Sequence, residues 1–270
     1  MTIDGVVAHY HRDDLLGILL RGLASVGRTP ADVRGDDLAP FDQFHLRGLT
    51  ATLELLELAG VSHGMRMLDL GGGLGGSARV AASRLGCHVT VVDLSPEFCE
   101  VGEEITRWLH LEDRVRFLIG DATAPPVPDA SFDVVWTQHA SMNIPDKAEL
   151  YHAAARALVP GGRFAMHDIM GDDGMEGMQY PVPWATSVEQ SALMHADLQR
   201  GLIRAAGFTE LVWRDLTAET HAWLEERLPT ITQSPIGSRL LVGERTKEAF
   251  TNLARNLANG RLRVVQAVFD

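Results

Sequence analysis

Three aspartates follow apolar, strand-like segments in the first half of the chain. Asp69 comes just before a turn rich in glycine, Gly71 to Gly76, and Asp93 lies about 20 residues further on. Asp121 follows the next apolar segment. Carboxylates at successive strand ends can accept hydrogen bonds from the hydroxyl, amino or ammonium groups of a bound molecule. The pattern therefore predicts one ligand site near these three acids.

The glycine turn fits two kinds of ligand. Gly71, Gly73 and Gly76 match G-x-G-x-x-G, a pattern typical of dinucleotide sites, where backbone N–H groups at a helix N-terminus bind a pyrophosphate. The carboxylate of Asp69 would oppose such an anion, and Gly75 supplies a further glycine at closer spacing. S-adenosylmethionine (SAM) has an ammonium, a sulfonium and two ribose hydroxyls but no phosphate. The acids therefore favour SAM over NAD as the cofactor.

The segments that must position these residues alternate between strand and helix patterns. Apolar and β-branched runs predict strands at 65–70, 87–95, 114–119, 132–140, 163–170, 208–217 and 261–269. Helical spacing predicts helices at 13–27, 46–60, 77–85, 96–111, 146–158, 191–206 and 244–258, and the Pro- and Asp-rich stretch after the first of these reads as a loop. This alternation predicts an α/β protein with a parallel sheet covered on both faces, whose ligand edge carries the loops after the strands.

Composition excludes several classes of partner and site. The chain has 270 residues, 46% of them hydrophobic, and a net charge of −12, which argues against nucleic acid and anionic membrane surfaces as partners. No apolar run is long enough to span a bilayer, and the N-terminus lacks the pattern of a secretory signal. Cys87 and Cys99 fit neither a disulfide framework nor a zinc site, so we expect a cytoplasmic protein.

The motifs together resemble those of class I SAM-dependent methyltransferases. D-x-G-x-G-x-G from Asp69 is followed by VVDLS, RVRFLIGDA, PDASFDVVW and LVPGGRF. This set is most similar to the small-molecule branch that includes the ubiquinone/menaquinone, tocopherol, sarcosine/dimethylglycine and sugar O-methyltransferases. The resemblance covers about residues 41–170, with weaker support to 217.

The resemblance implies a doubly wound, seven-stranded, mostly parallel sheet, the Rossmann-like methyltransferase fold. An N-terminal helical cap and an insertion after the fifth strand complete it. We expect residues 1–270 to form a single domain, since no linker or repeat interrupts the pattern. Its predicted parts are the cap at 1–62, the SAM-binding core at 63–170, a lid or insertion at 171–190 and the C-terminal part of the sheet at 191–270.

Cofactor contacts also follow from the resemblance. Asp93 would accept the ribose hydroxyls, Asp121 would bind the adenine amino edge, and the glycine turn with Gln138 would lie beside the methionine part. The segment 41–48 resembles the one that closes over SAM in these enzymes. The implied cofactor-binding residues are Gln43, His45, Gly48, Asp69, Gly71, Gly73, Gly75, Asp93, Leu94, Asp121, Ala122 and Gln138.

Two residues are candidates for catalysis. Methyl transfer is an in-line displacement on an activated sulfonium, so alignment can suffice unless the nucleophile must lose a proton. His139, after the fourth strand, has a suitable pKa for a general base. Asp168, after the fifth, matches the general base of the sugar O-methyltransferases. Each could instead be a hydrogen-bonded residue at a strand end. His167, by strand alternation, should face away from Asp168.

Ligand spacing typical of a metal site is missing, although His139, His167 and Asp168 could converge, so no metal is predicted. Relatives that methylate phosphoethanolamine carry an acid in place of His139 and a histidine in place of Asn143, which argues against their substrate. An apolar substrate pocket under the lid could be lined by Trp184 and methionines, although methionine also fills cores. The methionines in question are Met166, Met170, Met175, Met178 and Met194.

The sequence therefore predicts a SAM-dependent methyltransferase of secondary metabolism that acts on an O, N or C nucleophile of a small-molecule acceptor. The main alternative is a non-methylating cyclase on the same scaffold in natural-product biosynthesis. A SAM-binding regulatory protein and a nicotinamide-linked oxidoreductase stay open as well. A homodimer is an assembly that the sequence allows.

Overall fold

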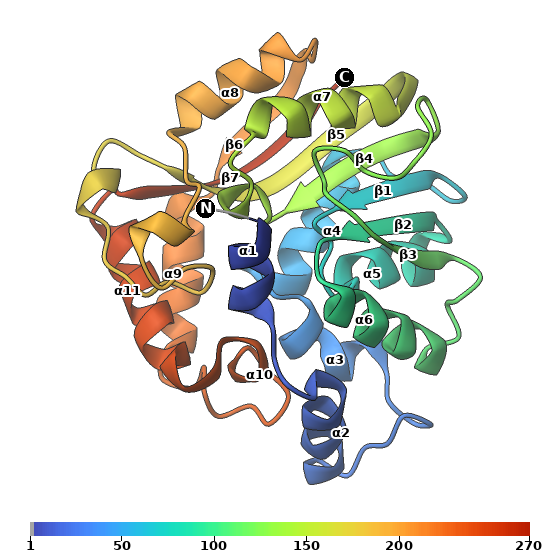
Figure 1. The fold of residues 1–270 in the computed structure, drawn as a ribbon, viewed down its shortest axis with the longest axis vertical. Coiled ribbons are helices and arrows are strands. Elements are labelled where there is room, and N and C mark those ends of the chain that lie inside the picture. Colours follow the sequence, from blue (N-terminus) through green and yellow to red (C-terminus); the bar gives the residue numbers. More distant parts are fainter. Residues whose placement is uncertain (1–2) are drawn as a thin grey trace.

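The computed structural model describes residues 3–270, and a seven-stranded sheet runs through its centre (Figure 1). The strands are β1 (Arg66–Leu70), β2 (His88–Asp93), β3 (Val115–Ile119), β4 (Phe132–Gln138), β5 (Leu158–Gly171), β6 (Glu210–Asp215) and β7 (Leu262–Phe269). Their order is β3-β2-β1-β4-β5-β7-β6. Neighbours pair in parallel from β3 to β5, whereas β7 runs antiparallel to β5 and β6. The predicted seven-stranded, mostly parallel fold is confirmed.

Helices flank the sheet, and the N-terminal and C-terminal parts of the chain contribute further helices (Figure 1). They are α1 (Ile3–Tyr10), α2 (Leu15–Ser25), α3 (Gly35–Asp42), α4 (Gly48–Leu58), α5 (Gly76–Leu85), α6 (Pro96–Trp108), α7 (Lys147–Ala157), α8 (Ala196–Ala205), α9 (Thr217–Arg227), α10 (Arg239–Val242) and α11 (Thr246–Ala258). Short polar side chains fix where some of them begin. Ser95 accepts the N–H of Phe98 at 3.2 Å before α6, and Asp146 accepts the N–H of Glu149 at 3.1 Å before α7.

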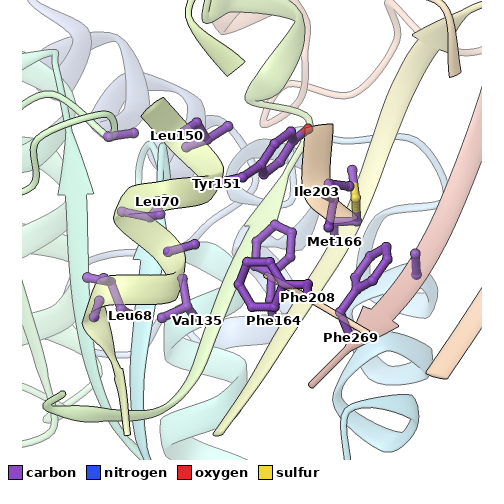
Figure 2. Close-up of a cluster of buried hydrophobic side chains, with 14 of the residues drawn as sticks. Leu68, Leu70, Val135, Leu150, Tyr151, Phe164, Met166, Ile203, Phe208 and Phe269 are labelled. Atoms are coloured by element: carbon purple, nitrogen blue, oxygen red, sulfur yellow. The ribbon is translucent and has the colours of Figure 1, made fainter. Parts of the chain in front are cut away.

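Side chains of the central strands alternate between two hydrophobic cores. Leu68 of β1 packs in the core beneath α7 and α8, whereas Met67 packs in the core beneath α4 and α5. Figure 2 shows the first of these cores, where Phe164 of β5 lies between Tyr151 of α7 and Phe208. Their ring centroids are 5.8 and 5.3 Å from that of Phe164. This double cover explains why the central strands are apolar throughout.

Helices α1, α3, α9 and α10 were not predicted. The stretch that becomes α3 contains Pro40 and three aspartates, which are typical of loops. Its first turn is closed by the carboxylate of Asp37, which accepts the N–H of Arg34 at 3.0 Å. Helix α8 begins at Ala196 instead of 191, because His195 caps it and pairs with Gly171 of β5.

The predicted lid or insertion at 171–190 packs closely on α11. Val182, Trp184 and Ala185 are buried in a cluster with Leu253 and other residues of α11. Side-chain amides of α11 also hold its backbone: Asn252 donates to the carbonyl of Pro181 and Asn256 to that of Gln179. None of the helices in residues 3–270 is long and apolar enough to cross a membrane.

A buried ion pair connects α3 to α5. The guanidinium of Arg79 lies 2.8 Å from the carboxylate of Asp42, and the two side chains are 3% and 5% exposed. Arg79 also donates through Nη1 to the carbonyls of Leu74 and Gly102, whereas its Nε is buried without a partner in the described structure. Burying such a pair is costly, but removing one partner is costlier still, because the other charge stays buried alone.

We predict that Arg79→Met lowers the free energy of unfolding by about 3–5 kcal/mol, because it leaves Asp42 uncompensated. Arg84→Met is the matched control, since Arg84 pairs with Asp36 at 3.7 Å and both side chains are well exposed. The control should cost less than about 1 kcal/mol. Urea denaturation at pH 7 measures both, and equal losses in the two variants would contradict this account of α3.

Candidate active site

A first cavity opens at the carboxyl ends of β1 to β4, which we call the strand-end cavity. Ten of the predicted site residues line it, and they come from the glycine turn, the ends of all four strands and the segment before α4. They are His45, Asp69, Gly71, Gly73, Asp93, Leu94, Asp121, Ala122, Gln138 and His139. Residues separated by up to about 90 positions are thus brought together by the parallel strands.

The glycine turn needs glycine for geometric reasons. Gly71 and Gly73 have φ values of 71° and 55°, in the left-handed region that side chains disfavour. A Cβ on Gly71 would lie only 2.6 Å from that of Ala140, after β4. Gly75 is different: it does not line the cavity, and its Cβ would meet the ring of Phe117 at 2.5 Å. A glycine is needed here because it lets the start of α5 approach the ring of Phe117.

Each of the three aspartates has a distinct environment. Asp93 accepts the N–H of Gly73 at 2.8 Å and that of Ser95 at 2.9 Å, and Asp121 accepts the N–H of Thr123 at 2.8 Å. Asp69 is 2% exposed, and its Oδ2 has no hydrogen-bond partner within the described part of the protein. Burial raises the pKa of Asp69 to about 7 and also raises the pKa of Asp93.

The outer wall of the strand-end cavity includes residues that the sequence analysis missed. Val6, Val7 and Tyr10 of α1 line it, and the Tyr10 hydroxyl accepts a hydrogen bond from Asn143 at 2.8 Å. Their i, i+1, i+4 spacing was a signal of this helix. The cavity measures about 140 Å³, below the range of ~300–1,000 Å³ typical of small-molecule pockets.

A second cavity of about 450 Å³ adjoins the first. Both are lined by Tyr10, Phe44, His45 and His139, so these four side chains form a shared wall. Gln43 and Gly48, predicted to contact SAM, line only the second cavity. The Oε1 of Gln43 accepts a hydrogen bond from Thr52 at 2.7 Å, and Gly48 begins α4.

The second cavity is further lined by other residues of the segment 36–50 and by residues from the C-terminal half of the chain. Its wall includes Met142, Ile169, Trp184, Trp223, Phe250 and Leu253. Trp184 was predicted to line a substrate pocket, but the five methionines predicted with it line neither cavity. Met166 and Met170 instead fill the core between the sheet and α7. For these two residues the structure favours the alternative that the sequence left open, methionine as core filler, because their side chains on β5 point into this core.

His45 and His139 of the shared wall pack against a third histidine, His167. The ring of His139 stacks on that of His167 with centroids 4.9 Å apart, and His45 lies 5.9 Å from both. Burial lowers the pKa of His139 well below 6.5, that of His45 to about 3 and that of His167 to about 4. All three are therefore neutral at pH 7. The Nε2 of His139 is buried without a hydrogen-bond partner among residues 3–270.

Asp168 lies away from both cavities. It is fully buried, and its carboxylate accepts the N–H groups of Ser141 at 3.0 Å and Ile169 at 2.9 Å. Lys147 donates to the carbonyl of Ser141 at 2.8 Å, and burial raises the pKa of Asp168 to about 6. Asp168 thus holds the turn after β4, which begins at His139 with a left-handed φ of 49°.

Among the described residues, one group with a geometry suited to a metal ion lies outside the two cavities. The group that brings three potential ligand atoms within 4.8 Å consists of Asp172, Asp173 and His195, none of which lines either cavity. Asp172 is already paired with Arg263 at 2.8 Å. His139, His167 and Asp168 do not form such a group.

Comparison with known proteins identifies clear relatives. Residues 68–166 match the family described as a methyltransferase domain. Over 186 residues the chain is 32% identical to methyltransferase GfsG of Streptomyces halstedii, which covers 68% of this chain and 67% of that protein. Two further methyltransferases align over only 27% and 54% of their own lengths.

Solved structures share the fold over nearly the whole chain. Geranyl diphosphate C-methyltransferase from Streptomyces coelicolor A3(2) superposes with a TM-score of 0.71 at 20% identity, over 99% of this chain and 97% of that one. The [4+2]-cyclase SpnF superposes with a TM-score of 0.68 at 20% identity, over 94% and 93%. At such identities the likeness concerns the fold.

The three buried histidines predict a loss of stability in acid. A neutral histidine whose pKa is lowered by folding stabilises the protein above its unfolded value of about 6.5. That contribution is lost as the pH falls toward the folded values of about 4 for His167 and 3 for His45. Between pH 7.5 and 5.5, His167→Gln should therefore lose about 1.4 kcal/mol less unfolding free energy than the wild type.

Urea denaturation at both pH values measures this difference. His88→Gln is the control, because His88 is exposed at the start of β2 and its replacement should leave the wild-type pH dependence unchanged. An identical pH dependence in all three proteins would show that His167 is not buried in the neutral form.

Proposed function

The chain belongs to the class I SAM-dependent methyltransferases, and we propose that it transfers the methyl group of SAM to an O, N or C atom of a small-molecule acceptor. One observation supports this most directly. Asp69, Asp93 and Asp121 end three neighbouring strands and line a single cavity together with the glycine turn. Three carboxylates around one cavity favour a ligand with hydroxyl, amino or ammonium groups over a ligand with phosphate groups.

The polar groups of the strand-end cavity fit the two ends of SAM. Three buried atoms of its lining residues lack partners: Oδ2 of Asp69, which can accept from an ammonium, Nε2 of Gln138, which can donate to a carboxylate, and Nε2 of His139. Asp93 would take the ribose hydroxyls and Asp121 the adenine amino group. Unsatisfied buried polar groups are costly, so a ligand that pairs them binds with favourable free energy.

The chain's own part in the reaction is alignment and proton removal. When bound, SAM supplies a methyl group on a sulfonium, which is already activated toward nucleophiles. Tyr10 and Phe44 of the shared wall line both cavities and would lie beside the two reactants. His139 Nε2 would accept a proton from the acceptor where one must be lost. We assign Asp168 a positioning role, since it holds the turn that carries His139.

Other parts of the proposal rest on the sequence. We propose that residues 1–270 act as one methyltransferase domain, in which 1–62 form the cap, 63–170 the SAM-binding core, 171–190 the insertion and 191–270 the C-terminal part of the sheet. A role in secondary metabolism, a cytoplasmic location and a homodimer are proposed on the same ground.

A cyclase that binds SAM without methyl transfer is the second candidate. Its support is the likeness in fold to the [4+2]-cyclase SpnF together with the size of the second cavity. Release of S-adenosylhomocysteine separates the two functions, because a cyclase leaves SAM intact. The methyltransferase relatives make the first candidate the stronger one.

The cofactor assignment predicts that Asp93→Ala weakens SAM binding by about tenfold or more, the loss of a charge-assisted hydrogen-bond pair. Asp215→Ala is a closely matched control. Asp215 also ends a strand and also accepts the N–H two residues on, that of Thr217 at 2.9 Å, but it does not line the cavity. Calorimetric titration with SAM compares them, and equal affinities would remove Asp93 from the site.

The role of His139 predicts a loss of turnover without a loss of cofactor affinity. His139→Asn is the sharper variant, because asparagine tolerates the left-handed backbone at this position. Its kcat should fall by about tenfold or more while the Kd for SAM stays within about twofold. An unchanged kcat with the physiological acceptor would exclude His139 from proton transfer.

A further inference from the structure

The second cavity has the dimensions of a site for a large ligand. Its volume of about 450 Å³ falls within the range of pockets that bury drug-sized molecules. A small acceptor such as an amino acid would leave most of this volume filled with water against apolar walls. Size alone therefore favours an acceptor with a fused-ring or long-chain body.

Apolar and polar residues occupy different parts of this cavity. Met142, Ile169, Trp184 and Leu253 are buried, and they form its inner surface. Thr230 and Ser234 are among the exposed lining residues of the segment after α9, so they mark the mouth. An acceptor that fits this gradient is apolar over most of its length and carries any further polar groups at the outer end.

Charges in the cavity are already neutralised or lie in solvent. Arg47 is held by Glu54, with both guanidinium nitrogens 2.7 Å from the carboxylate. Arg227 lies over the ring of Trp223 at 4.5 Å and is about half exposed. Asp36 is the single acid among the described lining residues, and its side chain is 84% exposed. A protonated amine would find no buried counter-charge here.

One buried polar atom lies where the two cavities meet. His139 lines both, and its Nε2 has no hydrogen-bond partner in the described structure. Leaving such an atom unpaired costs free energy, and a carbon nucleophile could not satisfy it. A hydroxyl of the acceptor would satisfy it and would lie next to the methyl donor.

We infer that the acceptor is a large, predominantly apolar molecule that presents one uncharged hydroxyl, phenolic or enolic, to His139, and that the reaction is O-methylation. This inference rests on the proposed function. The neutral hydroxyl suits a cavity without free charge, and the apolar body suits its inner surface. The residues that set acceptor choice are then Met142, Trp184, Trp223 and Phe250.

The corresponding step balances. A lone pair of the hydroxyl oxygen forms the new O–C bond, and the S–C bond breaks with its electron pair left on sulfur, which yields S-adenosylhomocysteine. The hydroxyl proton becomes far more acidic as the O–C bond forms, so it can pass to the weakly basic Nε2 of His139 and from there to water. Burial keeps His139 neutral and therefore able to accept it.

Calorimetry with defined probes tests the inference independently of turnover. The full chain, saturated with S-adenosylhomocysteine, is titrated with 17β-oestradiol and 4-dodecylphenol as large apolar phenols, and with sarcosine and dimethylglycine as small charged amines. We expect at least one phenol to bind with a Kd below about 100 μM and the two amines to show no heat of binding. The reverse order would overturn the inference.

Two variants locate the binding. Trp223→Ala removes part of the cavity wall and should weaken phenol binding about tenfold or more. Trp213→Ala, on β6, lies outside both cavities and should leave it unchanged. Ile231→Trp fills the cavity near its mouth and gives a second test if Trp223→Ala does not fold. Phenol binding that neither cavity variant weakens would contradict this assignment.

Product analysis keeps this inference separate from the proposed function. With SAM in place of S-adenosylhomocysteine, a bound phenol should yield its methyl ether and an equal amount of S-adenosylhomocysteine. Phenol binding in the second cavity without either product would support the apolar-acceptor assignment and contradict methyl transfer. Methylation of sarcosine or dimethylglycine alone would support methyl transfer and overturn the acceptor class.

Discussion

A hydrogen bond from the N–H of Gly73 to the carboxylate of Asp93, 2.8 Å long, connects the turn after β1 to the end of β2. It can form because the two strands run parallel with Leu70 opposite Val92, so that the turn and the acid reach the same edge of the sheet. It also requires the left-handed backbone that only glycine adopts without strain. The strand-end cavity, the start of α5 and the placement of Asp69 all depend on this connection.

The two cavities beside this edge of the sheet are lined largely by different parts of the chain. The sheet edge supplies the acids of the strand-end cavity, while α1 covers it from outside. Residues 36–50 line much of the second cavity, and the insertion, α9, the segment after α9 and α11 complete it. His139 belongs to both, and the buried carboxylate of Asp168 holds its turn from behind. The four side chains of the shared wall are the lining that the two cavities have in common.

Local patterns in the sequence were enough to predict the sheet and the strand-end cavity. Asp69, Asp93 and Asp121 each stand at the end of a short apolar run, and parallel pairing brings such ends together whatever lies between them. The second cavity had no such signal, because Met142, Trp184 and Phe250 meet only through the antiparallel return of β7 and the packing of α11. Asp168 was a candidate base by its resemblance to the sugar O-methyltransferases, with a role as a hydrogen-bonded residue at a strand end left open, and its burial and its contact with Ser141 depend on tertiary packing. The loop composition of residues 35–42 concealed α3, whose stability comes from the buried pair between Asp42 and Arg79.

The central claim is that the acids and the glycine turn form a SAM site and not a dinucleotide site. Calorimetric titration of the wild-type protein with SAM and with NAD, at the same pH and ionic strength, tests this claim most directly. The account predicts one SAM bound per chain with a Kd of roughly 100 μM or lower and no detectable heat from NAD. Binding of NAD with equal or higher affinity, or an absence of SAM binding, would contradict it.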